Sequence, residues 1–188
     1  TIDKKGTTDT PTETAEVKTF THFTFNSNKS VLDGNINGDG STVLKVYYTR
    51  DTYDVEVLGN NTKAGTFTNE SNTYKYDKVI TLSVTTNPGY TFLGWFNGET
   101  LACENSTFTF NVDKDITYTA TWEANLNTLN FNGNGNTDGD TLSMQIRTDD
   151  SATLTKNGFI RAGYTFIGWS TTKNGQVKYI DGADYLMG

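Results

Sequence analysis

The stretch GYTFLGW, Gly89–Trp95, decides the fold because the chain contains it twice. GYTFIGW occupies Gly163–Trp169, 74 residues later, and six of its seven positions are identical. Self-similarity at a fixed spacing indicates tandem structural units that each form one supersecondary module. A weaker third copy, HFTFN at His22–Asn26, places Phe23 and Phe25 at the ring positions. The chain is therefore expected to hold three related units.

Strand-like segments follow two of these copies. ITYTATW, residues 116–122, follows the middle copy, and TVLKVYYTR, residues 42–50, follows the first. Both alternate apolar and polar residues as a half-buried strand does. The expected units are residues 1–50, which lack an opening strand, a complete unit at 51–123, and residues 124–188, which lack a closing strand. YDVEVLG and NTLNFNGN open the later units without a linker, which predicts a stiff string.

The repeated stretch also predicts where the core lies. Tyr90 and Phe92 are two residues apart and share one face of a strand, and Trp95 follows the bend at Gly94. Buried rings of this kind remove about 150–250 Å² each from water, so few aliphatic residues are required. The same pattern assigns three residues to the core of the third unit, Tyr164, Phe166 and Trp169. A sugar-stacking platform formed by Trp95 and Trp169 is the alternative interpretation.

Composition sets further limits on the class of protein. Of 188 residues, 34% are hydrophobic and 13% aromatic, and 35 are Thr, which favours strands over helices. The net charge of −7, without a basic cluster, argues against nucleic-acid binding, because that requires a face that neutralises phosphates. No apolar run approaches the roughly 20 residues that span a bilayer, so no membrane insertion is expected. The chain starts at Thr1 rather than Met, and we expect an internal segment of a longer protein.

The stretch DGNINGDGSTVL, residues 33–44, resembles a calcium loop at its first positions. The twelfth position of a helix–loop–helix calcium site is a bidentate carboxylate, but here it is Leu44, inside an alternating strand pattern. Asn, Asp and Gly also favour tight turns, so the sequence predicts a hairpin turn instead. NGNGNTDGD, residues 132–140, receives the same interpretation, with a loose cation site on the acidic loop as the alternative.

Catalytic chemistry finds little support in the remaining residues. His22 is the only histidine and has no Cys or second His for metal binding, and one His with many scattered Asp supports no Ser–His–Asp pattern. Cys103 is expected to be a free, partly buried thiol in a turn. We predict that the chain is not an enzyme, and we assign no catalytic, metal-binding or cofactor-binding residue and no cofactor. Internal Lys–Asn or Thr–Gln crosslinks stay open, since no spacing identifies a reacting set.

The repeats resemble a known family. PGYTFLGWFNGE followed by DITYTATWE, and RAGYTFIGWSTTKNGQVKYIDGADY, are similar to the Listeria–Bacteroides repeat, the internalin B-repeat family. The middle unit is closer to the divergent relatives of that repeat. Residues 25–50 resemble the back half of a mucin-binding-protein-like module that often precedes such repeats. The resemblance covers nearly the whole chain.

This resemblance implies a mainly β fold, with tandem small β-grasp-like repeat domains in an elongated string. It implies an extracellular segment of a large secreted or wall-anchored surface protein of Gram-positive bacteria, acting as a structural spacer or in adhesion. A glycan- or protein-binding module and an accessory domain of a secreted enzyme are the alternatives. The expected partners are a host surface protein or glycan, or a second chain that pairs through an open edge strand.

Overall fold

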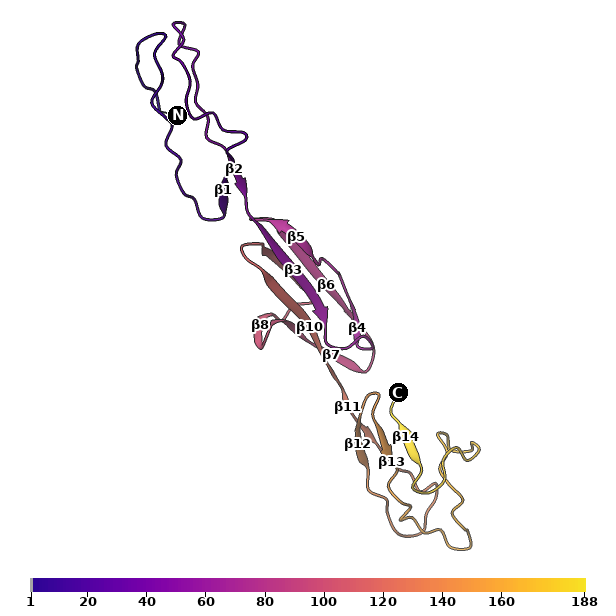
Figure 1. Cartoon of the computed structure of the whole chain (residues 1–188). Helices are drawn as coiled ribbons and strands as arrows, with labels where there is room; N and C mark the ends of the chain where they lie inside the picture. The colour runs from indigo at the N-terminus through magenta and orange to yellow at the C-terminus, as the bar shows by residue number, and fades with distance from the viewer. Residues whose placement is uncertain (1) are drawn as a thin grey trace. The chain divides into compact units, whose positions relative to one another are not determined.

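A computed structural model describes residues 2–188, and every regular element in that range is a β-strand (Figure 1). This confirms the mainly β fold predicted from the many Thr and aromatic residues. The strands are β1 Phe23–Phe25, β2 Tyr48–Arg50, β3 Thr52–Gly59, β4 Gly65–Phe67, β5 Asn72–Lys75, β6 Val79–Thr86, β7 Tyr90–Asn97, β8 Thr100–Cys103, β9 Thr107–Asn111, β10 Ile116–Ala124, β11 Leu126–Leu129, β12 Met144–Arg147, β13 Ser151–Thr153 and β14 Asp184–Leu186.

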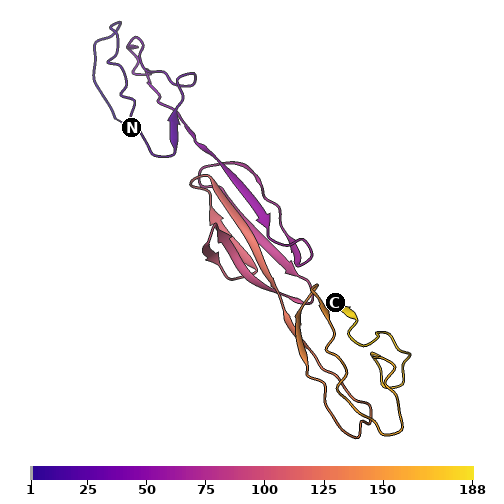
Figure 2. The ribbon, with the colours of Figure 1, turned by 60° about the horizontal axis from the view of Figure 1, so that its bottom comes forward.

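The strands form several small sheets. One sheet has the strand order β5-β3-β10-β7-β8, and a second has the order β4-β6-β9. Three two-stranded sheets pair β1 with β2, β11 with β12, and β13 with β14. Figure 2 shows that long strands occupy the middle of the chain, whereas loops predominate in its indigo and yellow parts. The middle of the chain therefore contributes most of the regular structure.

The residues divide into two compact units, which are described separately. The first comprises the chain up to Val57, Asn69–Leu82 and Thr107–Tyr118. Its buried side chains follow the two-residue period of strands, because Val55 and Val57 are buried whereas the residues that flank them are exposed. Ile80 and Leu82 repeat this alternation in β6. Phe108 and Phe110 of β9 contact the ring of Tyr118, with centroids 5.0 and 4.8 Å away.

The N-terminal part of the first unit has backbone pairing but no buried core. Among residues 2–50 none is buried. The Asp33–Leu44 segment does form a turn, in which the Gly40 N–H donates to the Asn37 carbonyl at 3.2 Å. On either side of it, Val31 and Lys45 exchange two backbone hydrogen bonds, as the hairpin interpretation requires. These residues thus hold their conformation through hydrogen bonds rather than through a core.

The strand predicted over residues 42–50 is wrong in its length, because only Tyr48–Arg50 is a strand. The Tyr47 N–H donates to the hydroxyl of Ser30 at 2.9 Å instead of to a backbone carbonyl. The Ser30 hydroxyl in turn donates to the Asn26 carbonyl at 2.7 Å. A side chain that takes the place of a ladder partner interrupts regular pairing. The alternation in the sequence does not reveal this substitution.

The second unit comprises Leu58–Thr68, Ser83–Ser106 and Thr119–Gly188. Trp95 is fully buried at 0% exposure, which confirms its predicted place in the core. The ring of Phe92 lies between two indoles, 6.0 Å from Trp95 and 5.6 Å from Trp122. Tilted and edge-to-face contacts of this kind stabilise aromatic pairs beyond their buried area. In the later part of the unit the buried apolar residues are Ile146, Leu154 and Met187.

The core predicted for the third repeat is wrong for two of its three rings. Tyr164 is 68% exposed and Phe166 is 39% exposed, and Trp169 is only half-buried. Gly163–Trp169 is not a strand, although its sequence nearly equals that of the strand-forming copy. The reason lies in pairing, because β7 has β10 beside it, whereas the later copy makes one isolated bridge, from Trp169 to Tyr179.

Candidate functional site

Two single residues join successive repeats. Asp51 alone separates the end of β2 at Arg50 from the start of β3 at Thr52. Asn125 alone separates the end of β10 from the start of β11. The two positions are 74 residues apart, the spacing of the repeated aromatic stretch. We call them the Asp51 junction and the Asn125 junction, and each lies within one compact unit.

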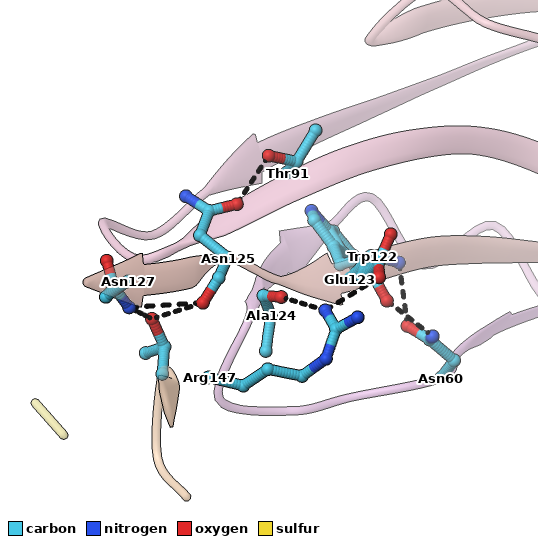
Figure 3. A network of polar contacts seen from close by, with 9 residues as sticks. Asn60, Thr91, Trp122, Glu123, Ala124, Asn125, Asn127 and Arg147 are labelled. Carbon is cyan, nitrogen blue, oxygen red and sulfur yellow. Dashed lines mark hydrogen bonds and ion pairs between the residues drawn. The ribbon is translucent and has the colours of Figure 1, made fainter. Parts of the chain in front are cut away.

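Hydrogen bonds to three residues, Gly89, Thr91 and Thr148, fix the Asn125 junction, and Figure 3 shows the bond from Thr91. The Asn125 N–H donates to the Gly89 carbonyl at 2.8 Å, and the Thr91 hydroxyl donates to Asn125 Oδ1 at 2.6 Å. The Asn125 carbonyl accepts the Thr148 N–H at 3.0 Å. Its backbone N–H, its backbone carbonyl and its side chain therefore all have partners. Gly89 and Thr91 flank the start of β7, whereas Thr148 follows β12, so Asn125 binds both repeats at once.

The Asp51 junction has the same three bonds. The Asp51 N–H donates to the His22 carbonyl at 3.0 Å, and the Thr24 hydroxyl donates to Asp51 Oδ1 at 2.6 Å. The Asp51 carbonyl accepts the Tyr76 N–H at 2.8 Å. A carboxylate and an amide can replace one another here because each offers a side-chain oxygen to a Thr hydroxyl. The same hydrogen-bond arrangement therefore occurs at both junctions.

The N–H group that each junction carbonyl accepts belongs to a tight turn. In the later turn the Asp150 N–H donates to the Arg147 carbonyl at 3.0 Å, and in the earlier one the Lys78 N–H donates to the Lys75 carbonyl at 3.1 Å. The third residue of both turns is an Asp in the left-handed region, with φ 64° at Asp149 and 65° at Asp77. Asp tolerates this conformation better than most residues do.

The N–H group of that Asp anchors the turn to a strand or chain segment behind it. Asp149 donates to the Met187 carbonyl at 2.8 Å, and Asp77 donates to the Val112 carbonyl at 2.7 Å. Met187 and Val112 are both buried. The turn that holds each junction is thus itself tied to the core of its unit.

The residues that accept from the junction N–H groups also share a backbone conformation. Gly89 has φ 85° and His22 has φ 66°, so both lie in the left-handed region. A Cβ atom at Gly89 would lie 2.7 Å from Thr148 Cγ2, which leaves no room for a side chain. At the Asp51 junction His22 instead stacks on the ring of Tyr76, with centroids 4.1 Å apart, and its Nδ1 lies 2.8 Å from the Tyr53 hydroxyl. His22 therefore has a structural contact at the junction.

Charged side chains surround the Asn125 junction. Arg147 Nη1 donates to Glu123 Oε1 at 2.7 Å and to the Ala124 carbonyl at 2.8 Å (Figure 3). Thr148 is 6% exposed, and its hydroxyl accepts the side-chain N–H of Asn127 at 3.0 Å. Buried polar groups of this kind are stable only when they are hydrogen-bonded. The junction satisfies that condition for its most buried hydroxyl.

An exposed Tyr–Asp–Lys cluster completes the site. The Tyr90 hydroxyl donates to Asp149 Oδ2 at 2.7 Å, and Lys63 Nζ lies 3.2 Å from the same oxygen. The Tyr90 hydrogen bond, followed by Lys63, lowers the pKa of Asp149. The hydrogen bond to Asp149 raises the pKa of Tyr90, with smaller contributions from desolvation and from the Asp149 charge. Both shifts have the sign expected when the bond forms between a neutral phenol and an ionised carboxylate.

The residues considered for other chemistry lie apart from this site. Cys103 lies in β8 opposite Trp95 rather than in the expected turn, and it is half-buried. In the 132–140 loop, Asn134 and Gly135 adopt positive φ, as tight turns require. Throughout residues 2–188, no group of three or more His, Cys, Asp and Glu side chains could hold a metal ion. The junctions were missed in the sequence, although the 74-residue spacing of Asp51 and Asn125 could have revealed them.

Comparison with known families agrees with the repeated geometry. Residues 53–126 match the divergent InlB B-repeat domain, and residues 128–188 match the Listeria–Bacteroides repeat domain. Each of these two regions is therefore a repeat of the family that it matches, and Asn125 lies at the end of the first match. Neither match reaches residues 1–52, so the resemblance of that region to a mucin-binding-like module stays a prediction. No curated protein and no solved structure matches the chain.

Residues 2–188 contain no helix that is long and apolar enough to cross a membrane.

Proposed function

We propose that the chain is a non-catalytic spacer segment of a bacterial cell-surface protein, in which clamped junctions hold successive repeats at fixed angles. Repeats of these families are typical of bacterial surface proteins, which supports an extracellular location. A surface spacer must keep its modules from folding back on one another. A junction of one residue whose backbone N–H and carbonyl are both hydrogen-bonded meets this requirement, whereas a flexible linker does not.

The observation that carries the proposal is the recurrence of one clamp at two junctions. Asp51 and Asn125 differ in charge, but each makes an N–H bond, a carbonyl bond and a side-chain bond to the repeats around it. Each neutral hydrogen bond contributes only about 0.5–1.5 kcal/mol. Several of them around one residue nevertheless restrict rotation about its φ and ψ angles. Stiffness at the joint, rather than affinity for a ligand, is the property that these contacts favour.

The test inserts two glycines between Asn125 and Leu126 and compares distance distributions. Spin labels on Glu104→Cys and Gln176→Cys, in a Cys103→Ala background, report on both sides of the junction. Wild type should give one narrow distribution, and the insertion should broaden it. The same insertion after Asp113, in the exposed loop between β9 and β10, is the matched control and should leave the distribution narrow. A wild-type distribution as broad as that of the junction insertion would refute a stiff spacer.

A second candidate, a ligand-binding module for a glycan or a protein, rests on exposed rings in the third repeat. Tyr164 projects from the surface, and Arg161 lies over its ring, 4.1 Å from the centroid. Such rings are common at binding surfaces because they offer a large contact area. A glycan array and a Tyr164→Ala variant distinguish this role. Binding that the variant abolishes favours the module, and an absence of binding leaves the spacer role alone.

A further inference from the structure

The chain enters and leaves the repeat matched at residues 53–126 through two neighbouring strands. The first, β3, begins at Thr52, directly after Asp51. The second, β10, ends at Ala124, directly before Asn125. In the five-stranded sheet of order β5-β3-β10-β7-β8 these two strands are hydrogen-bonded side by side. We call them the shear pair, and tension along the chain reaches this repeat through both of them.

The two strands of the shear pair run in the same direction. The Asp54 N–H donates to Asp115 Oδ1 at 2.8 Å, and the Thr117 hydroxyl donates to Glu56 Oε2 at 3.0 Å. Both contacts join residues that are 61 positions apart. A constant difference in residue number indicates a parallel pair, because in an antiparallel pair the sum of the two numbers is constant instead. The start of β3 and the end of β10 therefore lie at opposite ends of the shear pair.

Polar side chains close the shear pair at both ends. Near the start of both strands, Asp115 accepts the Asp54 N–H, as described above. Beyond the end of β3, the side chain of Asn60 accepts the Trp122 N–H and donates to the Trp122 carbonyl, both at 2.9 Å (Figure 3). The Asn60 backbone N–H also donates to the Ala120 carbonyl at 3.1 Å. Asn60 thus continues the pairing of β10 past the last residue of β3.

The direction of a pull decides how the bonds of a parallel pair are loaded. Tension along the chain pulls β3 at its start and β10 at its end, so it draws the two strands past one another. The hydrogen bonds between them are evenly spaced along the strands and are then loaded together. A pull on the two adjacent strand starts would instead open the same bonds one after another. Because each bond is weak by itself, simultaneous loading gives the greater resistance.

We propose that the shear pair is the force-bearing element of this repeat, and that Asn60 locks its far end against sliding. The inference rests on the proposed spacer function, because a surface spacer transmits tension between its neighbours. The core opposes sliding as well. Val55 and Val57 of β3 are buried, as are Ala120 and Trp122 of β10, so movement of either strand along its axis would withdraw apolar side chains from the core.

Single-molecule force measurements on the full chain test the proposal. Handles are attached to engineered cysteines in a Cys103→Ala background. Thr52→Cys with Leu126→Cys pulls the strands past one another, whereas Thr52→Cys with Lys114→Cys pulls the two strand starts apart. All three positions are exposed. At one loading rate, the rupture force should be at least about twofold higher for the first pair of handles, because several evenly spaced bonds share the load.

An Asn60→Ala variant tests the lock at the far end. It should lower the rupture force for the handles at positions 52 and 126. The force for the handles at positions 52 and 114 should not change, because that rupture begins at the opposite end of the pair. This unchanged value also shows that the variant is folded. Asn105→Ala, an exposed position outside both strands, is the matched control and should leave both forces as in wild type.

Equal rupture forces in the two pulling directions would overturn the proposal. A shear force that Asn60→Ala leaves unchanged would overturn the role of Asn60. The outcome is separate from that of the spacer function, which the spin-label distances test. Narrow wild-type distances with equal rupture forces would refute the shear pair alone. Broad distances with a higher shear force would refute the stiff spacer and support the shear pair.

Discussion

Trp95 and Trp169 occupy equivalent places in nearly identical heptapeptides, yet they differ in burial. Trp95 pairs with Ala120 of the neighbouring strand β10, and Ala120 and Trp122 are also buried, whereas Trp169 is half-buried against Phe131 and Phe166. In both, the indole Nε1 is buried and has no hydrogen-bond partner. The sequence identifies the ring that belongs in the core, but whether a strand pairs beside it depends on residues elsewhere in the chain.

Truncation of the two indoles should therefore have unequal effects. Trp95→Ala is expected to destabilise its repeat by about 3–5 kcal/mol, the usual result for a fully buried large ring. Trp169→Ala should cost less, about 1.5–3 kcal/mol, because part of the ring already contacts water. Urea denaturation, followed by separate NMR signals from each repeat, measures both. Equal losses would contradict the difference in burial.

Gly89 and Gly163 form a second matched pair. Both have positive φ, 85° and 78°, so Ala at either position should cost about 1–2 kcal/mol in backbone strain. Only at Gly89 does the added Cβ meet a neighbour, the side chain of Thr148 at 2.7 Å. Gly89→Ala should thus be more destabilising than Gly163→Ala by about 1–3 kcal/mol, the usual range for overpacking. Thermal melts of the two variants test this, and equal shifts in Tm would show that Thr148 moves aside freely.

At the scale of elements, the turn between β12 and β13 determines how the second junction responds to pH. Asp149 in that turn has a pKa lowered by its bonds to Tyr90 and Lys63. A lowered folded-state pKa stabilises the fold above the unfolded value, about 3.9, and this contribution disappears as pH falls through the folded value. The raised pKa of Tyr90 affects the stability of the fold at high pH. Its contribution is complete below about pH 10 and is lost as pH rises further.

The corresponding prediction concerns Asp149→Asn. The variant should be less stable than wild type near neutral pH. The difference should shrink as pH falls below the unfolded-state value, about 3.9, and through the lower folded-state pKa of Asp149. Thermal melts across this range measure the difference in Tm. Tyr90→Phe is the control, because loss of the hydroxyl should also flatten the pH dependence. A difference that stays constant down to the lowest pH would show that Asp149 stabilises the turn only through its conformation.

The sequence predicts elements well where alternation and pairing coincide. The pattern of YDVEVLG predicts β3, and its buried positions are Val55 and Val57, as period two requires. The same reasoning predicts too long a strand before Arg50, because the Ser30 hydroxyl that binds the Tyr47 N–H leaves the local pattern unchanged. It also places Tyr164 in the core, because the local pattern does not show that the later copy lacks a paired strand like β10. Propensity describes a segment, but pairing depends on which segments meet it.

At the scale of the whole molecule, local stability should follow the distribution of buried residues. The slowest amide exchange is expected in the middle strands, at Val55, Leu82, Trp95 and Ala120, since these residues are buried. The two-stranded pairs β1–β2 and β13–β14 should exchange much faster, because isolated two-stranded ribbons are marginally stable. Hydrogen exchange with mass spectrometry measures this. Uniform protection across residues 2–188 would contradict it.

The repeat organisation could be predicted from the sequence because identity at a fixed spacing does not depend on packing. The predicted boundaries at 50/51 and 123/124 stay predictions, but the spacing of 74 also separates Asp51 from Asn125. The side-chain partners, Thr24 and Thr91, are both Thr. The clamp could not be predicted from them alone, since the residues that bond the two junction backbones, such as His22, Tyr76 and Thr148, differ in type. Backbone groups make most of the clamp, and a backbone contact leaves no signature in the sequence.

The single-residue junctions also determine how the chain would carry a pulling force. Tension in β10 passes into β11 through one residue whose backbone groups are both engaged, so no slack is available to take up the load. The chain can lengthen only when paired strands separate. One 74-residue period would then release up to about 250 Å of extended chain, at 3.3–3.6 Å per residue. Such a segment would be inextensible under weak tension and would lengthen in large, discrete steps under strong tension.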